Sequence, residues 1–432
     1  MSWQVTGRDT VGRLGYASGN LGKSVLWSAL DYFFLFFLTE IWDLPPDLAG
    51  WVIFSAMAWD GLSDPLMGYL ADRTWSPLGK YGPYLLFGAP VCAATFWLLF
   101  QDPGVRGADA FWIVLGTSLL FRTAYTVCDV PHNALMARIA TTPADAAQIS
   151  GYRFFFSSAG ALLVAATIGW TLSESLSEAR DRAASVTLLG GLVYVIALWS
   201  AWFSVRRLDQ TTLNTARTTR LLPALLLSFS NPDLRRVLLT ALFQAASLPA
   251  FAKGLTYLAT YVYQTPAWSG QALMILTLAQ ALSIPLWMAL TRHLSKDRAL
   301  SLAYGVILAG LVAFVLMAPH PALAPLWLAL IGCGLSGANM VLWAMLPDAI
   351  HAGETTQGER VEALPTGLFT LMLKVGIGLS ALAMGLGLDL IGLKATAKGD
   401  PAFGQALPLL MAAIPATGAV LILWMRRLPL RM

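Results

Sequence analysis

Long apolar blocks, separated by short polar connections, constrain this chain more than any other feature. We place them at about 14–40, 48–71, 83–101, 110–133, 148–172, 184–204, 235–263, 268–291, 299–318, 322–346, 363–390 and 404–426. A helix needs about 20 residues to cross the hydrocarbon of a bilayer, and each block approaches or exceeds that length. Only 12% of the residues are charged, about half the roughly 25% of soluble domains. The pattern predicts an all-α polytopic membrane protein with twelve transmembrane helices and excludes a soluble enzyme.

Positive charge is divided unequally between the connections on the two sides of the membrane. With a cytoplasmic N-terminus, 18 of the Lys and Arg residues fall inside and five fall outside, namely Arg106, Arg180, Arg182, Lys394 and Lys398. Basic connections stay on the cytoplasmic side, so we expect both termini in the cytoplasm and the chain in a bacterial-type inner membrane. Because topology accounts for the basic excess, we expect membrane lipids and no nucleic acid among its partners.

The longest connection, about 205–234, is basic and lies in the middle of the chain. Its apolar stretch 221–227 is expected to lie along the inner membrane surface. Six spans precede it within 1–204 and six follow within 235–432, so we expect two pseudo-symmetric six-helix halves joined by a cytoplasmic linker. Such paired halves are typical of transporters with a site near the bilayer midplane. We expect a monomer.

Several ionisable residues remain inside the predicted spans. Each costs about 2.5–3.5 kcal/mol at the bilayer centre on insertion scales, so such residues face a wet cavity or one another. They form a functional-site hypothesis and comprise Lys23, Asp31, Asp60, Asp64, Arg122, Asp129, Arg153, Lys253 and Lys374.

Asp60 and Asp64 are four residues apart in the second span, so they share one helix face. Hard carboxylate oxygens suit Na⁺, and a shared proton is another way to neutralise two adjacent acids. A salt bridge to a basic residue of another span is the structural alternative. The pair predicts a site for Na⁺ or H⁺.

Asp129 shares its helix face with Thr126, whose hydroxyl adds an oxygen ligand, and with Arg122, seven residues earlier. An Arg122–Asp129 ion pair within this span is an open structural alternative. Lys374 stands alone in the middle of its span and needs a carboxylate partner, for which Asp60, Asp64 and Asp129 are the candidates.

The remaining intramembrane charges are less specific. Lys23 and Arg153 lie near the cytoplasmic ends, where long side chains also reach water. Asp31 is a candidate substrate contact, and Lys253 is expected to pair with it or with another acid. The three cysteines and four histidines show no metal-ligand spacing. A polytopic membrane enzyme is the alternative from another class, but no catalytic motif supports it, and we expect no cofactor.

The segment from Asp64 to Arg73, followed by 79–84 (Gly-Lys-Tyr-Gly-Pro-Tyr), resembles the signature of the glycoside–pentoside–hexuronide:cation symporters. This melibiose-permease-like family belongs to the major facilitator superfamily. The resemblance extends over the whole chain, through Gly22-Lys23, 129–131 (Asp-Val-Pro), 152–155 (Tyr-Arg-Phe-Phe) and Lys374. It implies the major facilitator fold and alternating access.

The resemblance also implies roles for single residues. It makes Asp60 and Asp64 the cation site, with Thr126 contributing. It gives Asp129 a role in substrate binding and coupling and Arg153 a substrate contact, and it places Lys374 beside the cation site. The cytoplasmic residues Asp72, Arg73 and Lys80 are expected to latch the outward-facing state.

Three departures from the family pattern leave the ion and the substrate open. Ser63, a candidate cation ligand, replaces an Asn of sodium-coupled relatives. Ser24 replaces an Asp that grips sugar hydroxyls, and Asn133 replaces a Trp that stacks on a sugar ring. Arg122 makes the site more electropositive and suits carboxylate or phosphate. The candidate substrate contacts are Asp129, Arg153, Lys23, Arg122, Asp31 and Asn133.

The sequence therefore predicts a cation-coupled symporter with Na⁺ or H⁺ as the coupling ion. Its substrate is a small organic solute such as a glycoside or uronide. A carrier of a lysolipid or another amphipathic anion, built on the same fold, is the alternative.

Overall fold

The computed structural model describes residues 3–74, 76–102, 104–139, 143–172, 176–209, 231–318, 320–357, 363–393 and 400–427. These residues form helices and the turns between them, without a β-strand in the described ranges. The chain divides into two compact units, Met1–Asn214 and Thr215–Met432. Their boundary falls inside the expected linker 205–234. Residues 210–230, with the apolar stretch 221–227, lie outside the described residues.

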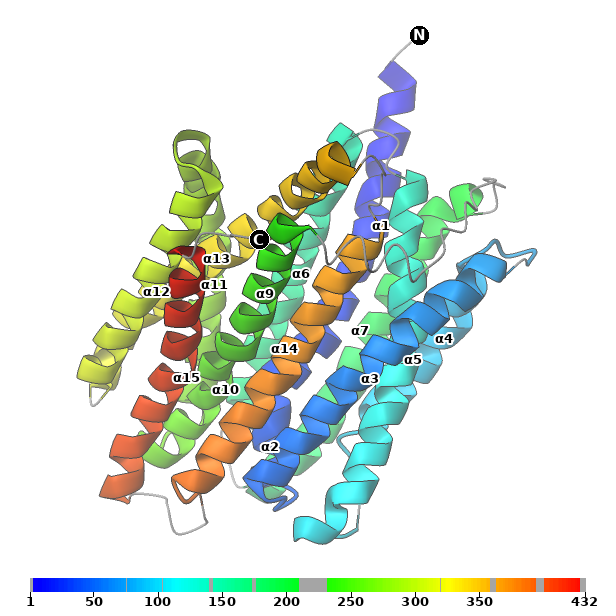
Figure 1. Ribbon diagram of the computed structural model, residues 1–432. Helices are drawn as coiled ribbons and strands as arrows, with labels where there is room; N and C mark the ends of the chain where they lie inside the picture. The colour runs from blue at the N-terminus through cyan, green and yellow to red at the C-terminus, as the bar shows by residue number, and fades with distance from the viewer. Residues whose placement is uncertain are drawn as a thin grey trace. The chain divides into compact units, whose positions relative to one another are not determined.

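The first unit begins with a span of three helical pieces, which are α1 (Trp3–Ala29), the π-helical turn η1 (Leu30–Phe34) and α2 (Leu35–Glu40). The helices that follow are α3 (Pro46–Arg73), α4 (Gly82–Leu98), α5 (Phe111–Ile139), preceded by the 3₁₀ turn η2 (Gly107–Ala110), α6 (Pro143–Thr171) and α7 (Leu176–Asp209). α1 packs against α6 and α7, α3 and α4 pack against α5, and α4 also packs against α7 (Figure 1).

The second unit repeats this order of packing. Its elements are α9 (Pro232–Ser247), α10 (Pro249–Tyr257), the π-helical turn η3 (Leu258–Val262), α11 (Trp268–His293), α12 (Lys296–Met317), the 3₁₀ turn η4 (Pro321–Leu323), α13 (Ala324–Gln357), α14 (Ala363–Leu390) and α15 (Pro401–Arg427). Here α9 packs against α14 and α15, α11 and α12 pack against α13, and α12 also packs against α15.

The first span of each unit ends in the same kind of turn. In the first unit the N–H of Leu44 donates to the carbonyl of Leu38 at 3.0 Å, around Asp43 with a φ of 54°. In the second unit the N–H of Thr265 donates to the carbonyl of Ala259 at 2.9 Å, around Gln264 with a φ of 52°. A left-handed residue lets the chain turn back and satisfy a carbonyl at the helix end. The two units thus share both a turn and a packing scheme.

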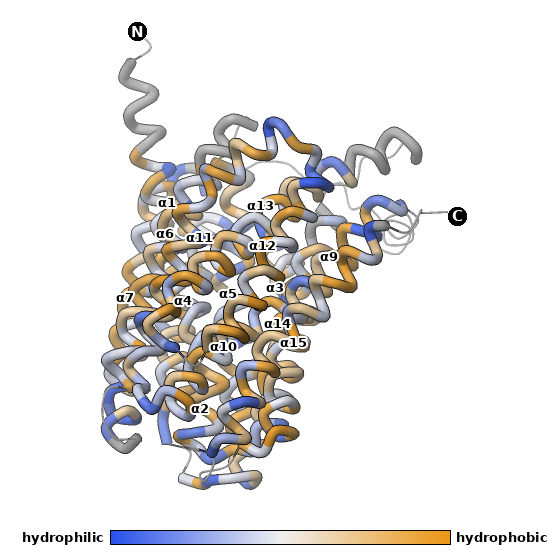
Figure 2. The backbone as a smooth tube through the Cα atoms, turned by 90° about the vertical axis from the view of Figure 1, so that its left-hand side faces the viewer, coloured by the Kyte–Doolittle hydropathy of each residue, from blue (hydrophilic) through white to orange (hydrophobic). Residues whose placement is uncertain are grey.

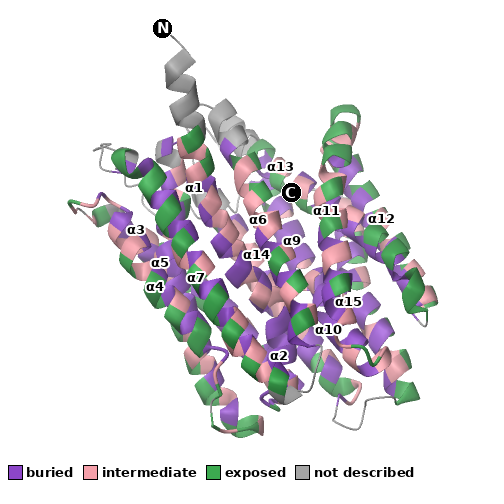
Figure 3. Cartoon of the chain, turned by 180° about the vertical axis from the view of Figure 1, so that it is seen from behind, coloured by how far each residue is buried: buried purple, intermediate pink, exposed green. Residues whose placement is uncertain are grey.

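Within the described residues, ten helical segments are long and apolar enough to cross a membrane. The chain is an integral membrane protein. Hydrophobic residues dominate the helices, and hydrophilic residues gather at their ends (Figure 2). Exposed residues occur along the lengths of the helices (Figure 3). On α7, for example, Leu192 and Ile196 are 52% and 66% exposed, as suits a surface in contact with lipid.

Glycines allow α1 to approach its neighbours closely. A Cβ on Gly160 of α6 would lie 2.6 Å from the carbonyl oxygen of Leu21, and one on Gly22 would lie 2.7 Å from the Cα of Tyr194 on α7. Small residues at such crossings are the usual way for membrane helices to pack tightly. These contacts fix α1 against α6 and α7 beside the polar residues described next.

Candidate cation and substrate site

A carboxylate and two hydroxyls meet where α3 crosses α5. The hydroxyl of Thr126 donates to Oδ1 of Asp64 at 2.8 Å, and the Ser63 Oγ lies 3.4 Å from the same hydroxyl. Thr126 is 1% exposed, whereas Asp64 and Ser63 are half-buried. The structure thus brings together three of the four predicted cation ligands. Their oxygens are the hard donors that suit Na⁺.

The fourth predicted ligand, Asp60, has different surroundings. Its Oδ2 lies 3.4 Å from Nη1 of Arg122, and the two side chains are 0% and 4% exposed. The other terminal nitrogen of Arg122 donates to Sδ of Met57 at 3.0 Å. The open alternative of an Arg122–Asp129 pair within α5 is wrong, because the guanidinium reaches across to α3 instead.

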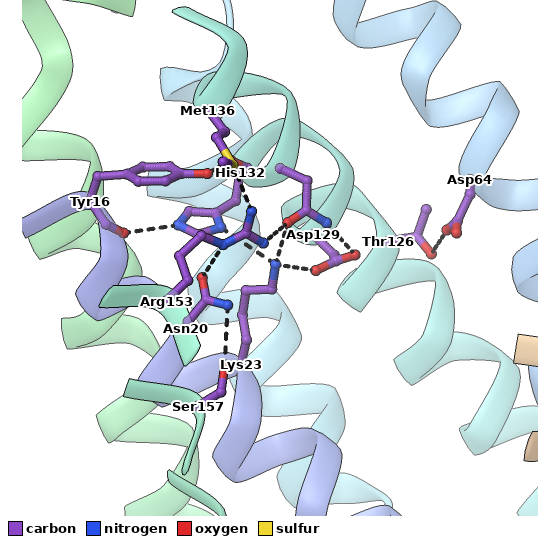
Figure 4. A network of polar contacts seen from close by, with 11 residues as sticks. Tyr16, Asn20, Lys23, Asp64, Thr126, Asp129, His132, Met136, Arg153 and Ser157 are labelled. Carbon is purple, nitrogen blue, oxygen red and sulfur yellow. Dashed lines mark hydrogen bonds and ion pairs between the residues drawn. The ribbon is translucent and has the colours of Figure 1, made fainter. Parts of the chain in front are cut away.

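Asp129 forms its ion pair with Lys23 of α1 (Figure 4). The Lys23 ammonium also donates to Oδ1 of Asn133 at 2.9 Å, and Nδ2 of Asn133 donates to Oδ2 of Asp129 at 3.0 Å. Lys23 and Asp129 are 8% and 15% exposed at their side chains, whereas Asn133 is exposed. The nearly buried Lys23–Asp129 ion pair is thus hydrogen-bonded to the exposed amide of Asn133.

Arg153 of α6 joins the same cluster (Figure 4). Its Nη2 donates to Oδ1 of Asn133 at 2.7 Å and its Nε donates to Oδ1 of Asn20 at 3.0 Å. The amide of Asn20 in turn lies 3.4 Å from the Ser157 hydroxyl. The predicted substrate residues Lys23, Asp129, Asn133 and Arg153 therefore form one network across α1, α5 and α6.

His132 and Tyr16 support this network and were missed by sequence reasoning. Their rings stack with centroids 4.7 Å apart, and the Tyr16 hydroxyl donates to the His132 carbonyl at 2.9 Å. Nδ1 of His132 lies 3.4 Å from the Lys23 ammonium. A Cβ on Gly19 would lie 2.6 Å from the ring, so only glycine leaves room for it there. The sequence did contain a sign of this role, because His132 lies between the predicted site residues Asp129 and Asn133.

The three remaining predicted intramembrane charges differ in burial. Asp31 is half-buried in the π-helical turn η1, Lys253 of α10 is 2% exposed, and Lys374 is half-buried in α14 of the second unit. The pairings expected for Lys253 and Lys374 stay predictions.

The expected latch residues make local contacts. The Arg73 guanidinium lies 3.4 Å from the ring centroid of Tyr69, one turn earlier on α3, and the Lys80 ammonium lies 5.3 Å from that of Tyr81. The side chain of Asp72 lies outside the described residues. The role of the latch stays a prediction.

A buried carboxylate beside these residues was not predicted. Asp209, at the end of α7, accepts from the N–H groups of Tyr81 and Gly82 at 3.0 and 2.8 Å, and from the Trp202 indole at 3.3 Å. Gly79, with a φ of 93°, passes so close that a Cβ there would lie 2.4 Å from this carboxylate. The acid satisfies the first N–H groups of α4 and ties its start to the end of α7.

In the described part of the chain, no group of three or more His, Cys, Asp or Glu residues could hold a metal ion. Any ion at the α3–α5 crossing would therefore rely on hydroxyl oxygens as well as carboxylates.

A family model described as an MFS/sugar transport protein matches residues 15–432. The chain belongs to this family. Among the similar proteins is the uncharacterized symporter YnaJ of Bacillus subtilis (strain 168), which is 24% identical over 96% of this chain and 90% of its own length. The sodium-dependent lysophosphatidylcholine symporter 1 of Xenopus tropicalis is 23% identical over 90% of this chain and 81% of its own.

The putative glycoside/cation symporter YagG of Escherichia coli (strain K12) is also 23% identical to this MFS transporter, over 92% of this chain and 86% of its own. Among solved structures, the nucleoside transporter NupG shares the fold, with a TM-score of 0.68 and 14% identity over 96% of this chain and 99% of its own. The chain is a secondary transporter of the major facilitator superfamily and not an enzyme.

Proposed function

We propose that this transporter is a symporter that couples the movement of a cation to that of an anionic organic solute. The cation binds at Asp64 with the hydroxyls of Thr126 and Ser63. The observation that carries the proposal is the hydrogen bond of 2.8 Å from Thr126 to Asp64, because it places a carboxylate and a hydroxyl together between two membrane helices. Relatives named as a sodium-dependent symporter and as a glycoside/cation symporter support cation coupling.

The substrate site is the network around Asn133. Two cations, Lys23 and Arg153, meet one carboxylate, Asp129, so this set carries a formal surplus of one positive charge. A guanidinium binds carboxylate or phosphate in a forked geometry. We propose that a hexuronide binds here, with its carboxylate at Arg153 and its hydroxyls at Asp129 and Asn133.

We do not include Arg122, a substrate contact expected from the sequence, among the proposed substrate contacts. Its guanidinium is nearly buried and bound to Asp60, so it adds no free positive charge for a substrate. The electropositive character expected from Arg122 comes from Lys23 and Arg153 instead.

One helix connects the two sites. Thr126, Asp129 and Asn133 are spaced by three and four residues on α5, so they share one face. A small movement of α5 on cation binding therefore changes the substrate contacts. By linkage, substrate must then raise the affinity for the cation by the same factor.

The transport cycle needs the second unit as well. We propose that α3 and α4 are spans too, which gives twelve, with both termini in the cytoplasm of a bacterial inner membrane. Lys374 is proposed to neutralise the emptied ion site during the return step, and Asp72, Arg73 and Lys80 are proposed to latch the outward-facing state. Reporter fusions at both termini test the topology, and a periplasmic C-terminus would contradict it.

A crevice in the first unit favours an amphipathic lipid as the second candidate substrate. Its lining comes from α1, η1, α4, α6 and α7, and its empty space, open mouth included, is about 830 Å³. Leu163 and Leu189 line it and are 50% and 61% exposed. The lining threonines Thr167, Thr171 and Thr187 donate to carbonyls of their own helices, so their hydroxyl protons are already used within the protein.

Uptake into proteoliposomes tests the proposal and separates the two substrates. A radiolabelled hexuronide, the matching neutral glycoside and a lysophospholipid are compared for the wild type and for Arg153→Gln. We expect hexuronide uptake that is stimulated by a cation gradient, and a KM that rises roughly tenfold or more in the variant because a charged hydrogen bond is lost. Uptake of the neutral glycoside at equal rates by both proteins would contradict an anionic substrate, and uptake of the lysophospholipid alone would establish the second candidate.

A further inference from the structure

Arg122 and Asp60 form the most deeply buried ion pair among the described residues for which a contact is given, with side chains 4% and 0% exposed. Removing either charge from water is costly unless the other accompanies it. The pair joins the middle of α5 to the middle of α3, one helical turn from Asp64. A permanent positive charge therefore lies at one of the two carboxylates that the sequence assigned to a mobile cation.

Two further contacts of the guanidinium suit a cation. The Met57 sulfur accepts from Nη2 at 3.0 Å, and the ring of Trp27 on α1 lies with its centroid 5.1 Å from the guanidinium carbon. Aromatic faces attract cations, and the guanidinium keeps its charge at any physiological pH. Three helices, α1, α3 and α5, thus hold Arg122 against Asp60.

Asp64 has another kind of neighbour. Thr126 donates to it at 2.8 Å, and Ser63 lies 3.4 Å from Thr126. The two acids of α3 therefore have separate tasks. Asp60 is bound to an arginine, whereas Asp64 accepts a hydrogen bond from a threonine hydroxyl.

We propose that Arg122 is a tethered counter-cation that takes the place of a mobile Na⁺ at Asp60. The mobile cation is bound at Asp64, Ser63 and Thr126 alone, so the site has one negative charge fewer than a pair of free carboxylates. This assignment rests on the proposed symport function. It predicts that Na⁺ binds weakly to the wild type, because ion affinity follows the charge count of the ligands.

Replacing Arg122 with a neutral side chain of similar polarity tests the proposal without any transported substrate. The purified Arg122→Gln variant and the wild type are unfolded thermally in detergent, with NaCl titrated against choline chloride at constant ionic strength. In the variant Asp60 has lost its guanidinium, and Na⁺ can bind between Asp60 and Asp64. We expect half-maximal stabilisation at a Na⁺ concentration roughly tenfold lower than for the wild type, because a second carboxylate then attracts the ion.

Two further variants are controls, and the Na⁺ responses of the wild type and of Asp60→Asn still test the proposal if Arg122→Gln does not fold. Arg122→Lys keeps the positive charge and should retain the weak Na⁺ response of the wild type. Asp60→Asn combined with Arg122→Gln removes both charges, and it should fold without gaining a Na⁺ response. Equal Na⁺ responses of Arg122→Gln and the wild type would overturn the proposal. So would a strong wild-type response that Asp60→Asn abolishes.

The failure of this assignment is distinguishable from the failure of symport itself. The Na⁺ titration reports on ion binding alone, whereas symport is tested by uphill transport in Asp64→Asn. A Na⁺ response gained in Arg122→Gln supports the counter-cation even if no solute is accumulated.

Discussion

Thr126 is the residue whose hydroxyl defines the proposed ion site. Thr126→Val removes that hydroxyl and keeps nearly the same volume, so Asp64 loses the hydrogen bond of 2.8 Å. We expect the cation concentration for half-maximal transport to rise roughly tenfold, which corresponds to the loss of one hydrogen bond to a charged group.

Thr117→Val on the same helix is the matched control. Its hydroxyl donates to the carbonyl of Ile113 at 3.0 Å, remote in sequence from the ion site, so its cation dependence should equal that of the wild type. If Thr126→Val had the same cation dependence as the wild type, the Thr126 hydroxyl would not be a ligand.

Helical spacing was enough to predict which polar residues share a face, as for Asp60 with Asp64 and Thr126 with Asp129. It was not enough to predict which cation pairs with which acid. Arg122 binds Asp60 and Lys23 binds Asp129. These pairs form between different helices, so they depend on how α1, α3 and α5 cross, which the spacing within one helix does not specify.

The contact between α1 and α6 depends on Gly160. A Cβ there would meet the carbonyl oxygen of Leu21 at 2.6 Å and Cβ of Ser24 at 2.9 Å, and the first of these is backbone that has little room to move. Gly160→Ala should therefore destabilise the protein by about 1–3 kcal/mol through overpacking, measured by thermal unfolding in detergent.

Gly151, on the same helix, has no atom within 4 Å of the position of a Cβ. Gly151→Ala should be stabilising by about 0.5–1 kcal/mol, because it restricts the unfolded chain. If both variants had the same stability, close packing of α1 on α6 would not explain Gly160.

The connection between α4 and η2 contains a pH-sensitive contact. Asp102 accepts from Arg106 at 2.7 Å and from the Gly104 N–H at 3.0 Å, and it forms an ion pair with Arg180 of α7. These donors, the hydrogen bond from Arg106 above all, lower the pKa of Asp102 from 3.8 to about 2. A depressed pKa means that the ionised carboxylate stabilises the folded state above pH 3.8 and that this contribution is lost as the pH falls toward 2.

Asp102→Asn should therefore lower the melting temperature slightly at pH 7, and the difference from the wild type should shrink below about pH 4. The effect is small because the carboxylate is 31% exposed. Asp109→Asn, which changes an exposed acid of η2, serves as the control. If the difference in melting temperature between Asp102→Asn and the wild type stayed constant down to about pH 2, titration of Asp102 would not be its cause.

Hydropathy located the helices well, and local turns less well. The apolar blocks correspond to helices in both units, but the π-helical turns η1 and η3 were not predicted, because a wider turn leaves no mark in a pattern of apolar residues. α7 continues to Asp209, five residues into the expected linker. There its last carboxylate binds the start of α4, a contact between segments distant in sequence.

At the scale of the whole molecule, the two units share one packing scheme, but their chemistry differs. The ion pairs and hydroxyls of the proposed sites lie in α1, α3, α5 and α6 of the first unit. Among the described residues of the second unit, an uncharged contact joins α9 to α13 and α12, where Gln244 donates to Asn339 at 2.7 Å and accepts from Tyr304 at 2.6 Å. A duplicated fold therefore carries its proposed ion chemistry mainly in one half, to which Lys374 of the other half is expected to contribute.

The most direct test of the central claim is the uphill accumulation of radiolabelled hexuronide in proteoliposomes under an imposed cation gradient. The wild type should concentrate the solute. Asp64→Asn should fail to do so and yet still exchange it across the membrane, because the substrate network of Lys23, Asp129 and Asn133 is intact. Accumulation by Asp64→Asn to the wild-type level would contradict the account.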